Sequence, residues 1–240
     1  PKHDRVVSTV GRLWNEEYGG YCLFGWDNFF LAYMTGLSNR ALAYANVIEH
    51  LHGKTEGGFI PNDNRGNGSK SFDRSQPPVG GIMVKEIYKR FPEKWFLQAT
   101  FDDLLGWNRW WLRDRINEGL LSYGSSPADN PFNEPVFGTR VAAGYESGMD
   151  DSPMYVGVPF NKDKKTLELQ DVGLNSLYIA DCYALAEMAG IIGRLDEQYE
   201  LLERAEEFSH RLQDIWDPDL GAFLNYRTDV DTSSSRVSPT

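Results

Sequence analysis

The sequence predicts an all-α protein. Two observations lead to this fold class. Apolar residues recur at intervals of three and four through most of the chain, and hardly any stretch alternates between apolar and polar residues. About seven or eight helical segments follow from this pattern, separated in turn by long and short loops. With 240 residues, of which 41% are hydrophobic, the chain can form one large domain with a substantial core.

Each helix is predicted from its apolar stripe and its end signals. Ser38 is a suitable N-cap for the third segment, and Gly53 ends it. The pair Pro77 and Pro78 suits the first turn of the next helix, and Pro218 follows the end of the last. The predicted helices cover residues 5–18, the second half of 21–37, 39–52, 77–91, 92–112, 167–189 and 196–216. Residues 221–226 are predicted to form a short strand or turn.

Two loops stand out between the helices. Residues 54–75 are rich in Gly, Asn, Asp, Lys and Ser, and an irregular loop longer than about 12–15 residues is usually functional or disordered. Residues 145–153 hold three carboxylates, Glu146, Asp150 and Asp151, with a glycine between them and a proline at the end. This segment shows no helical or alternating period, so it is predicted to be a loop.

Composition excludes several classes of function. A net charge of −11 disfavours nucleic acid and anionic membranes as partners. Two cysteines, Cys22 and Cys182, are too few for a disulfide framework and are predicted to be buried free thiols. No apolar run approaches the roughly 18 residues of a membrane span. Without an evident signal peptide, localisation stays unknown, with the cytoplasm slightly favoured.

No metal site or cofactor is predicted. His50 and His52 are two residues apart and cannot share a helix face. The polar loop resembles a calcium loop in composition, but Arg74 stands where an EF-hand requires Glu.

Several aromatic and charged clusters have an ordinary structural explanation. Trp107, Trp110 and Trp111 lie at helical spacing and are expected in the core rather than on a sugar platform. Arginines and aspartates on the same helix are expected to form a solvated face: Arg109, Arg113, Arg115, Asp102, Asp103 and Asp114.

Three loop segments place an aromatic residue or Gln beside a carboxylate or at the start of a helix. They are residues 24–27, 75–78 and 145–153. Sugars bind such surfaces, because their C–H faces stack on aromatic rings while their hydroxyls bond to carboxylates and amides. Cleavage of a glycosidic bond also needs two carboxyl groups, one of which protonates the leaving oxygen. The pattern therefore favours a carbohydrate-active protein.

The sequence resembles glycoside hydrolase family 63 and the related trehalases, a group that includes processing α-glucosidase I and the hydrolases of mannosylglycerate and glucosylglycerate. The resemblance is carried in the same order along the chain by Trp26-Asp27-x-Phe29-Phe30, Gly58-Phe59-Ile60-Pro61-Asn62, Gln76-Pro77-Pro78, Glu146-Ser147-Gly148-Met149-Asp150-Asp151-Ser152-Pro153 and Asp171-Val172-Gly173-Leu174-Asn175. The element Glu-Ser-Gly-x-Asp is the most specific of these.

The resemblance implies an (α/α)6 toroid and hydrolysis of an α-glucosidic or α-mannosidic bond with inversion. Asp150 would be the general acid. Substrate-binding residues would be Trp26, Asp27, Gln76, Tyr145 and Glu146, with Glu146 either structural or orienting the substrate. The family's general base is a Glu from a C-terminal segment that has no match here. Residues 1–240 are therefore expected to form one catalytic domain, incomplete at its C-terminal end, with the base beyond residue 240.

Three alternatives remain open. The substrate could be the small charged glucosylglycerate or mannosylglycerate, for which Arg140 is the one candidate cation on the leaving-group side. The domain could bind carbohydrate without cleaving it, with Asp150 vestigial. A helical-repeat interaction scaffold is a third possibility, although it would not need aromatic residues beside carboxylates in its loops. The expected partner is an α-linked oligosaccharide or small glycoside, and the oligomeric state is unknown.

Overall fold

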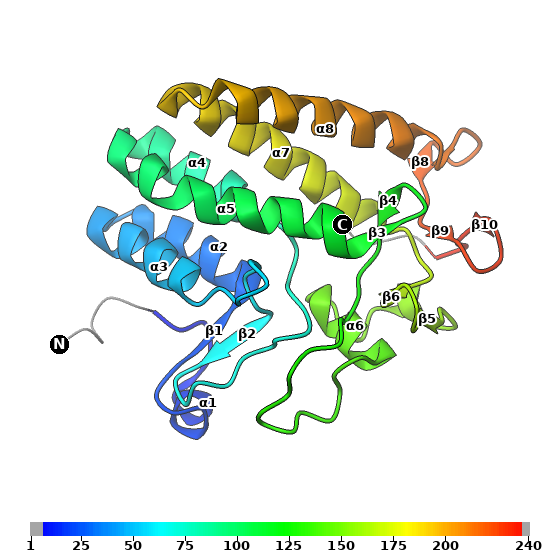
Figure 1. The fold of residues 1–240 in the computed structure, drawn as a ribbon, viewed down its shortest axis with the longest axis horizontal. Helices are drawn as coiled ribbons and strands as arrows, with labels where there is room; N and C mark the ends of the chain where they lie inside the picture. The colour runs from blue at the N-terminus through cyan, green and yellow to red at the C-terminus, as the bar shows by residue number, and fades with distance from the viewer. Residues whose placement is uncertain (1–6, 237–240) are drawn as a thin grey trace.

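The computed structural model describes residues 7–236 and is mainly helical (Figure 1). Eight α-helices are present in this part of the chain: α1 (Arg12–Glu17), α2 (Gly25–Gly36), α3 (Arg40–His52), α4 (Gly80–Arg90), α5 (Lys94–Arg115), α6 (Arg140–Glu146), α7 (Val172–Ile192) and α8 (Leu195–Gln213). The predicted helical class is confirmed. Of the helix predicted at 5–18, residues 5 and 6 lie outside the described residues, and residues 7–11 are irregular.

Three helical hairpins form the body of the molecule. Within each hairpin the two helices pack together, as α2 with α3, α4 with α5 and α7 with α8. The first helices of the hairpins also contact in succession, α2 against α4 and α4 against α7. Figure 1 shows the hairpins stacked from α2 and α3 (blue) to α8 (orange). The described residues thus form an open row of hairpins rather than a closed ring.

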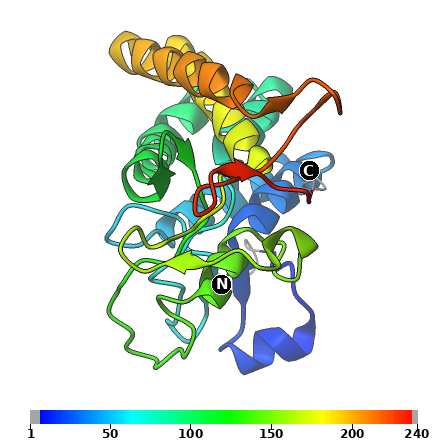
Figure 2. The same ribbon diagram turned by 90° about the vertical axis from the view of Figure 1, so that its right-hand side faces the viewer.

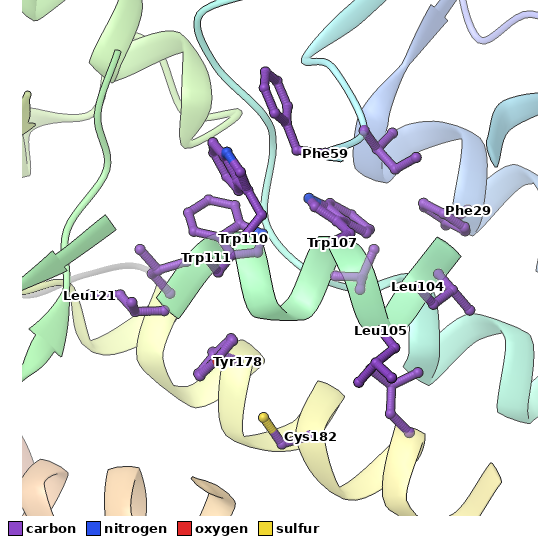
Figure 3. Packing of buried hydrophobic residues seen from close by; sticks show 14 of the residues in the cluster. Phe29, Phe59, Leu104, Leu105, Trp107, Trp110, Trp111, Leu121, Tyr178 and Cys182 are labelled. Carbon is purple, nitrogen blue, oxygen red and sulfur yellow. The ribbon is translucent and has the colours of Figure 1, made fainter. Parts of the chain in front are cut away.

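Tryptophans of α5 lie at the centre of the core (Figure 3). Trp107, Trp110 and Trp111 are all buried, which confirms their predicted place in the core. Trp107 stacks on Phe29 of α2 with ring centroids 5.7 Å apart, and Trp110 stacks on Phe59 at 4.4 Å. The tryptophans of α5 therefore join the α4–α5 hairpin to the α2–α3 hairpin and to the long loop before α4.

Short antiparallel strand pairs lie in the connections. They are β1 (Cys22–Phe24) with β2 (Asp63–Arg65), β3 (Ile116–Asn117) with β4 (Leu120–Leu121), β5 (Phe160–Asn161) with β6 (Thr166–Leu167), β7 (Trp216–Asp217) with β8 (Ala222–Phe223), and β9 (Tyr226–Arg227) with β10 (Thr232–Ser233). The pairing of Phe24 with Asp63 brings the start of α2 beside the long polar loop. Figure 2 shows α6 and the green and yellow-green loops around it below the helices α4, α5, α7 and α8.

Three of the predicted helices begin at different residues in the structure, and at two of these N-termini a neighbouring side chain supplies the N-cap hydrogen bond. Asn39, not Ser38, caps α3, because its side chain accepts the amide of Leu42 at 3.0 Å. Helix α4 begins at Gly80 rather than at the two prolines, and α7 begins at Val172 because Asp171 caps it. Gly53 ends α3 as predicted.

Two other predictions can be compared with the structure. Cys22 and Cys182 are buried free thiols, as predicted. Arg115 is not on a solvated face: its side chain is completely buried, and it pairs with Glu146, whereas Arg109 and Arg113 form exposed ion pairs. Among the helices described, none combines the length and the apolar character that crossing a membrane requires.

Candidate active site

The segment that carries Asp150 begins with a short helix that the sequence pattern missed. Thr139 caps α6 by accepting the amide of Ala142 at 3.2 Å. Tyr145 and Glu146 form the last turn of this helix, so the prediction of a loop over all of 145–153 is wrong at its start. The loop proper begins at Ser147, whose hydroxyl donates to the carbonyl of Gly144 at 2.6 Å. The reversal that follows places Asp150 beside α6.

Asp150 lines a pocket of about 290 Å³. The wall combines α6, the loop after it and one strand residue: Arg140, Val141, Gly144, Tyr145, Asp150, Asp151, Ser152, Tyr155, Val156 and Leu167. Tyrosine rings and aliphatic side chains therefore lie beside two carboxylates and one guanidinium. A pocket of this composition can hold a small polar molecule with an apolar face.

The environment of Asp150 favours its protonated form. Partial burial raises the pKa of the Asp150 carboxyl, and the neighbouring Asp151 carboxylate raises it further. Arg74 acts in the opposite direction. A carboxyl group with a raised pKa retains its proton closer to neutral pH, as a general acid requires.

Trp26 packs directly on the loop of Asp150. The backbone of Gly148 has φ +68°, and a Cβ atom there would lie 2.6 Å from the indole ring of Trp26. Only glycine suits this position, for its conformation and for the close approach of the ring. Gln76 holds the other side of the residue, because its Oε1 accepts the backbone amide of Trp26 at 3.0 Å. The structure thus brings Trp26 and Gln76 beside the acidic loop, although neither lines the pocket of Asp150.

Asp27 lies in the first turn of α2, next to Trp26. The side chain is half-buried, and this burial raises the pKa of its carboxyl. The position at a helix N-terminus is favourable for a carboxylate. Asp27 is also outside the pocket wall.

Glu146 is enclosed by protein donors. Arg115 approaches it with two nitrogens, at 2.6 and 2.9 Å, and both side chains are fully buried. The amides of Ser75 and Gly124 donate to the same carboxylate at 2.8 and 2.6 Å. Burial raises the pKa of Glu146, while Arg115 and the two amides lower it. Each carboxylate oxygen of Glu146 accepts hydrogen bonds from two N–H groups. Of the two roles expected for Glu146, structural or substrate-orienting, this arrangement fits the structural one.

In the sequence, Arg74 was noted only because it breaks the EF-hand pattern, and not as a site residue. Its guanidinium is buried, donates to Asp73 at 2.8 Å and lies over the ring of Tyr145, 5.4 Å from the centroid. It therefore supports the ring that lines the pocket and also lowers the pKa of Asp150. One sequence signal could have identified Arg74 as a site residue: it lies in the long polar loop of residues 54–75, two residues before Gln76. Nothing local distinguished Arg115.

Arg140, at the start of α6, ties this helix to the segment that follows the Asp150 loop. Its Nε donates to the carbonyl of Val158 at 2.9 Å, and its guanidinium also bonds to the carbonyl of Tyr155. Across residues 7–236, no three His, Cys, Asp or Glu side chains are grouped so that they could hold a metal ion.

The fold matches solved structures of glycoside hydrolases. The GH63 mannosylglycerate hydrolase of Thermus thermophilus, solved with glucose, superposes with a TM-score of 0.69 at 18% identity, over 89% of this chain and 62% of that one. The neutral trehalase of Saccharomyces cerevisiae gives a TM-score of 0.71 at 19% identity, over 89% of this chain and 48% of the trehalase. At such identities the likeness is one of fold alone, and this chain spans 62% or less of these relatives' length.

These matches show that the chain shares the helical fold of these two hydrolases. A family model described as the mannosylglycerate hydrolase MGH1-like glycoside hydrolase domain matches residues 20–239. The chain belongs to this family, which confirms the resemblance inferred from its motifs. Among curated proteins, none shows significant similarity to the chain.

Proposed function

We propose that this protein hydrolyses an α-glucosidic or α-mannosidic bond with inversion, and that Asp150 is the general acid. The observation that carries the proposal is the place of Asp150 in a tyrosine-lined pocket where burial and Asp151 both raise its pKa. In this mechanism Asp150 protonates the oxygen of the leaving group as the bond breaks. Trp26, Asp27 and Gln76 shape the sugar subsite beside the loop.

Inversion needs a second carboxylate that activates water on the opposite face of the sugar, roughly 6.5–9.5 Å from the acid. Within the described residues, the pocket wall offers only Asp151, which is adjacent to Asp150 in the chain and cannot flank the bond from the other face. The pocket wall thus supplies no base from the described residues, and we assign that role to the Glu beyond residue 240 that the family resemblance implies.

A charged leaving group is favoured by one specific observation. Arg140 lines the same pocket as Asp150, and its guanidinium is already oriented by two backbone carbonyls. A Thermus thermophilus mannosylglycerate hydrolase of similar fold was solved with D-glycerate. A glycoside of glycerate, whose carboxylate would pair with Arg140, is thus the second candidate substrate.

The test is proton NMR that resolves the two anomers, with kojibiose, nigerose, trehalose, glucosylglycerate and mannosylglycerate as substrates. For a chain that extends beyond residue 240 and includes the base, early release of the β-anomer from one of them is the expected result, and it also identifies the substrate. The same release by residues 1–240 alone would contradict the assignment of the base. Asp150→Asn should abolish this release while sugar binding persists, because the amide keeps the shape but cannot donate the acid proton. Asp151→Asn is the matched control and should retain turnover at acidic pH, where Asp150 keeps its proton in both forms.

The same experiment separates the alternatives. Full turnover by Asp150→Asn would contradict the assignment of the acid. If a chain that extends beyond residue 240 binds a sugar, and neither its wild type nor any variant turns the sugar over, a carbohydrate-binding domain would be favoured. Loss of turnover on the glycerate glycosides alone in Arg140→Gln would favour the charged substrate.

A further inference from the structure

A second pocket, larger than the one beside Asp150, lies at the C-terminal end of α8. Its volume is about 580 Å³, and small-molecule sites usually have volumes of about 300–1,000 Å³. The wall comes from the turn between β3 and β4, the end of α8, and the residues Gln170 and Tyr226. We call it the α8 pocket, and the proposed mechanism does not use it.

The walls of the α8 pocket are fixed to one another. Arg211, in the last turn of α8, donates to the carbonyl of Gly119 at 2.7 Å and so ties this helix to the turn between β3 and β4. Gln170 and Tyr226 exchange two backbone hydrogen bonds, at 2.9 and 3.1 Å. The pocket is therefore preformed, and a ligand would bind without first ordering its walls.

Two acceptors on the wall receive no hydrogen bond from residues 7–236. One is the carboxylate of Asp214, an exposed residue that follows the last residue of α8. The other is Oε1 of Gln170, whose Nε2 donates to the carbonyls of Asn117 and Glu118 at 2.8 and 3.2 Å. Both oxygens are available to accept hydrogen bonds from the O–H groups of a ligand.

The charges on the wall disfavour an anionic ligand. Arg211 is already paired with Glu207, and Glu118 is paired with Lys164 at 2.8 Å. The carboxylate of Asp214 forms no ion pair within the described part of the chain. An anion would meet this uncompensated negative charge, whereas a neutral hydroxyl would donate a charge-assisted hydrogen bond to it.

Apolar residues lie on the same wall as these acceptors. Leu120 and Ile215 are buried, and Tyr226 is the aromatic residue of the wall. The Tyr226 hydroxyl already donates to Asp231 at 2.6 Å. An aromatic ring beside available carboxylate and amide oxygens is a combination that sugars bind, because their C–H faces stack on the ring while their hydroxyls donate.

The α8 pocket and the pocket of Asp150 adjoin through one short segment. Leu167 lines the pocket of Asp150, and Gln170 lines the α8 pocket. The Cα atoms of residues three positions apart are separated by at most about 11 Å. A ligand in the α8 pocket would therefore lie beside the proposed substrate pocket, on the other side of residues 167–170.

We propose that the α8 pocket is a second carbohydrate-binding site, which takes one neutral hexose unit. The Tyr226 ring stacks on the C–H face of the sugar, and Asp214 and Gln170 accept hydrogen bonds from its hydroxyls. This site goes beyond the proposed function and does not require that the protein cleave a glycosidic bond.

The test is protein-observed NMR on a chain that extends beyond residue 240 and carries Asp150→Asn, so that no sugar is consumed. Methyl α-D-glucopyranoside and methyl α-D-mannopyranoside are the probes, and spermidine is the cation used for comparison. Amide shifts of residues 118–120 and 214–215 report on the α8 pocket. Amide shifts of residues 150–152 report on the pocket of Asp150.

Two variants remove proposed contacts, and each has a matched control. Asp214→Ala removes the available carboxylate, and Asp219→Ala removes an exposed carboxylate from the turn between β7 and β8, outside the pocket wall. Tyr226→Leu removes the ring, whereas Tyr226→Phe keeps the ring and loses the hydrogen bond to Asp231. Because Asp214 is exposed, Asp214→Ala tests the site even if Tyr226→Leu fails to fold.

We expect at least one of the two glycosides to shift the amides of the α8 pocket, with a Kd on the order of 1 mM. Asp214→Ala should weaken this binding about tenfold, because it removes a charged acceptor. Tyr226→Leu should weaken it to a similar degree through the loss of stacking. Asp219→Ala and Tyr226→Phe should leave the affinity unchanged.

Shifts confined to the pocket of Asp150 with both glycosides would overturn the proposal. It would also be overturned if spermidine alone shifted residues 118–120 and 214–215, or if Asp214→Ala left the sugar affinity of the α8 pocket unchanged. Failure of the proposed cleavage has a separate readout, since a wild-type chain that turns over no glycoside can still bind one in the α8 pocket.

Discussion

Arg115 and Glu146 form a bidentate ion pair in which neither side chain is exposed. The guanidinium of Arg115, at the end of α5, reaches the carboxylate of Glu146 at the end of α6 with distances of 2.6 and 2.9 Å. The same guanidinium donates to the carbonyl of Asp73 at 3.1 Å. One buried charge pair thus joins the long α5 helix, the polar loop and the segment that leads to Asp150.

Breaking this pair should be strongly destabilising. Arg115→Met leaves the Glu146 carboxylate buried without its countercharge, which typically costs about 3–5 kcal/mol. Urea denaturation measures the difference in unfolding free energy. Arg113→Met is the matched control on the same helix, because the Arg113–Asp114 pair is exposed and such pairs contribute roughly 0–1 kcal/mol. Equal losses in the two variants would contradict a special role for the buried pair.

Asp181 provides a second test through pH. Its Oδ1 accepts the amide of Gly81 at 2.8 Å and so caps α4 from a neighbouring hairpin, and its Oδ2 accepts from Asn108 at 2.9 Å. Burial raises the pKa of Asp181 to about 7, from an ordinary value of 3.8. The folded protein therefore keeps a proton that the unfolded chain releases. By linkage, this group's contribution to the unfolding free energy falls as the pH rises from about 4 to about 7.

Asp181→Asn should remove that pH dependence. The variant is also expected to be less stable, by about 1–3 kcal/mol. The reason is that the new side-chain NH2 group would face either the Gly81 amide or the Asn108 side-chain amide, both of which donate hydrogen bonds to Asp181 in the wild type. The stability advantage of the wild type should shrink between pH 4 and pH 7, as measured by denaturant midpoints across that range. A constant difference would mean that Asp181 titrates alike in the folded and unfolded states.

Asp151 should control the pH range of turnover. Its carboxylate raises the pKa of Asp150, so Asp151→Asn should lower that pKa. Because a general acid acts only while protonated, the loss of activity at high pH should begin at a lower pH in the variant. Rate profiles against pH measure this directly. Asp163→Asn, in the exposed turn between β5 and β6, is the control and should leave the profile unchanged. A shift to higher pH in Asp151→Asn would contradict the electrostatic argument.

Gly148 should be irreplaceable because of Trp26. In Gly148→Ala the new Cβ would lie 2.6 Å from the indole, in a backbone conformation with positive φ. The ring or the loop must move, and sugar affinity should weaken up to about tenfold if stacking is lost. Gly221→Ala has a similar φ of +64° and no neighbour within 4 Å of the added Cβ. It should show the conformational cost, roughly 1–2 kcal/mol, without a loss of affinity. Titration calorimetry and thermal melts distinguish the two effects.

Several local features of the fold were predictable from sequence. The amphipathic stripes located most helices, and Gly53 marked the end of α3, because these signals act within a few residues. Helix α6 was missed because it has only seven residues, too few for a clear apolar period. The assignment of Ser38 as a cap was wrong by one residue, since Asn39 supplies the side chain that accepts the Leu42 amide.

By itself, the sequence determined the helical class and the family, because periodicity and short motifs are written into consecutive residues. It also supplied Asp150 as the candidate acid. Only the tertiary structure decided which distant side chains meet. Arg115 is 31 positions from Glu146, and its sequence neighbours Asp114 and Arg113 are exposed partners of each other. Such pairings depend on how the hairpins pack, since burial and charge act through space between segments that the chain order leaves unrelated.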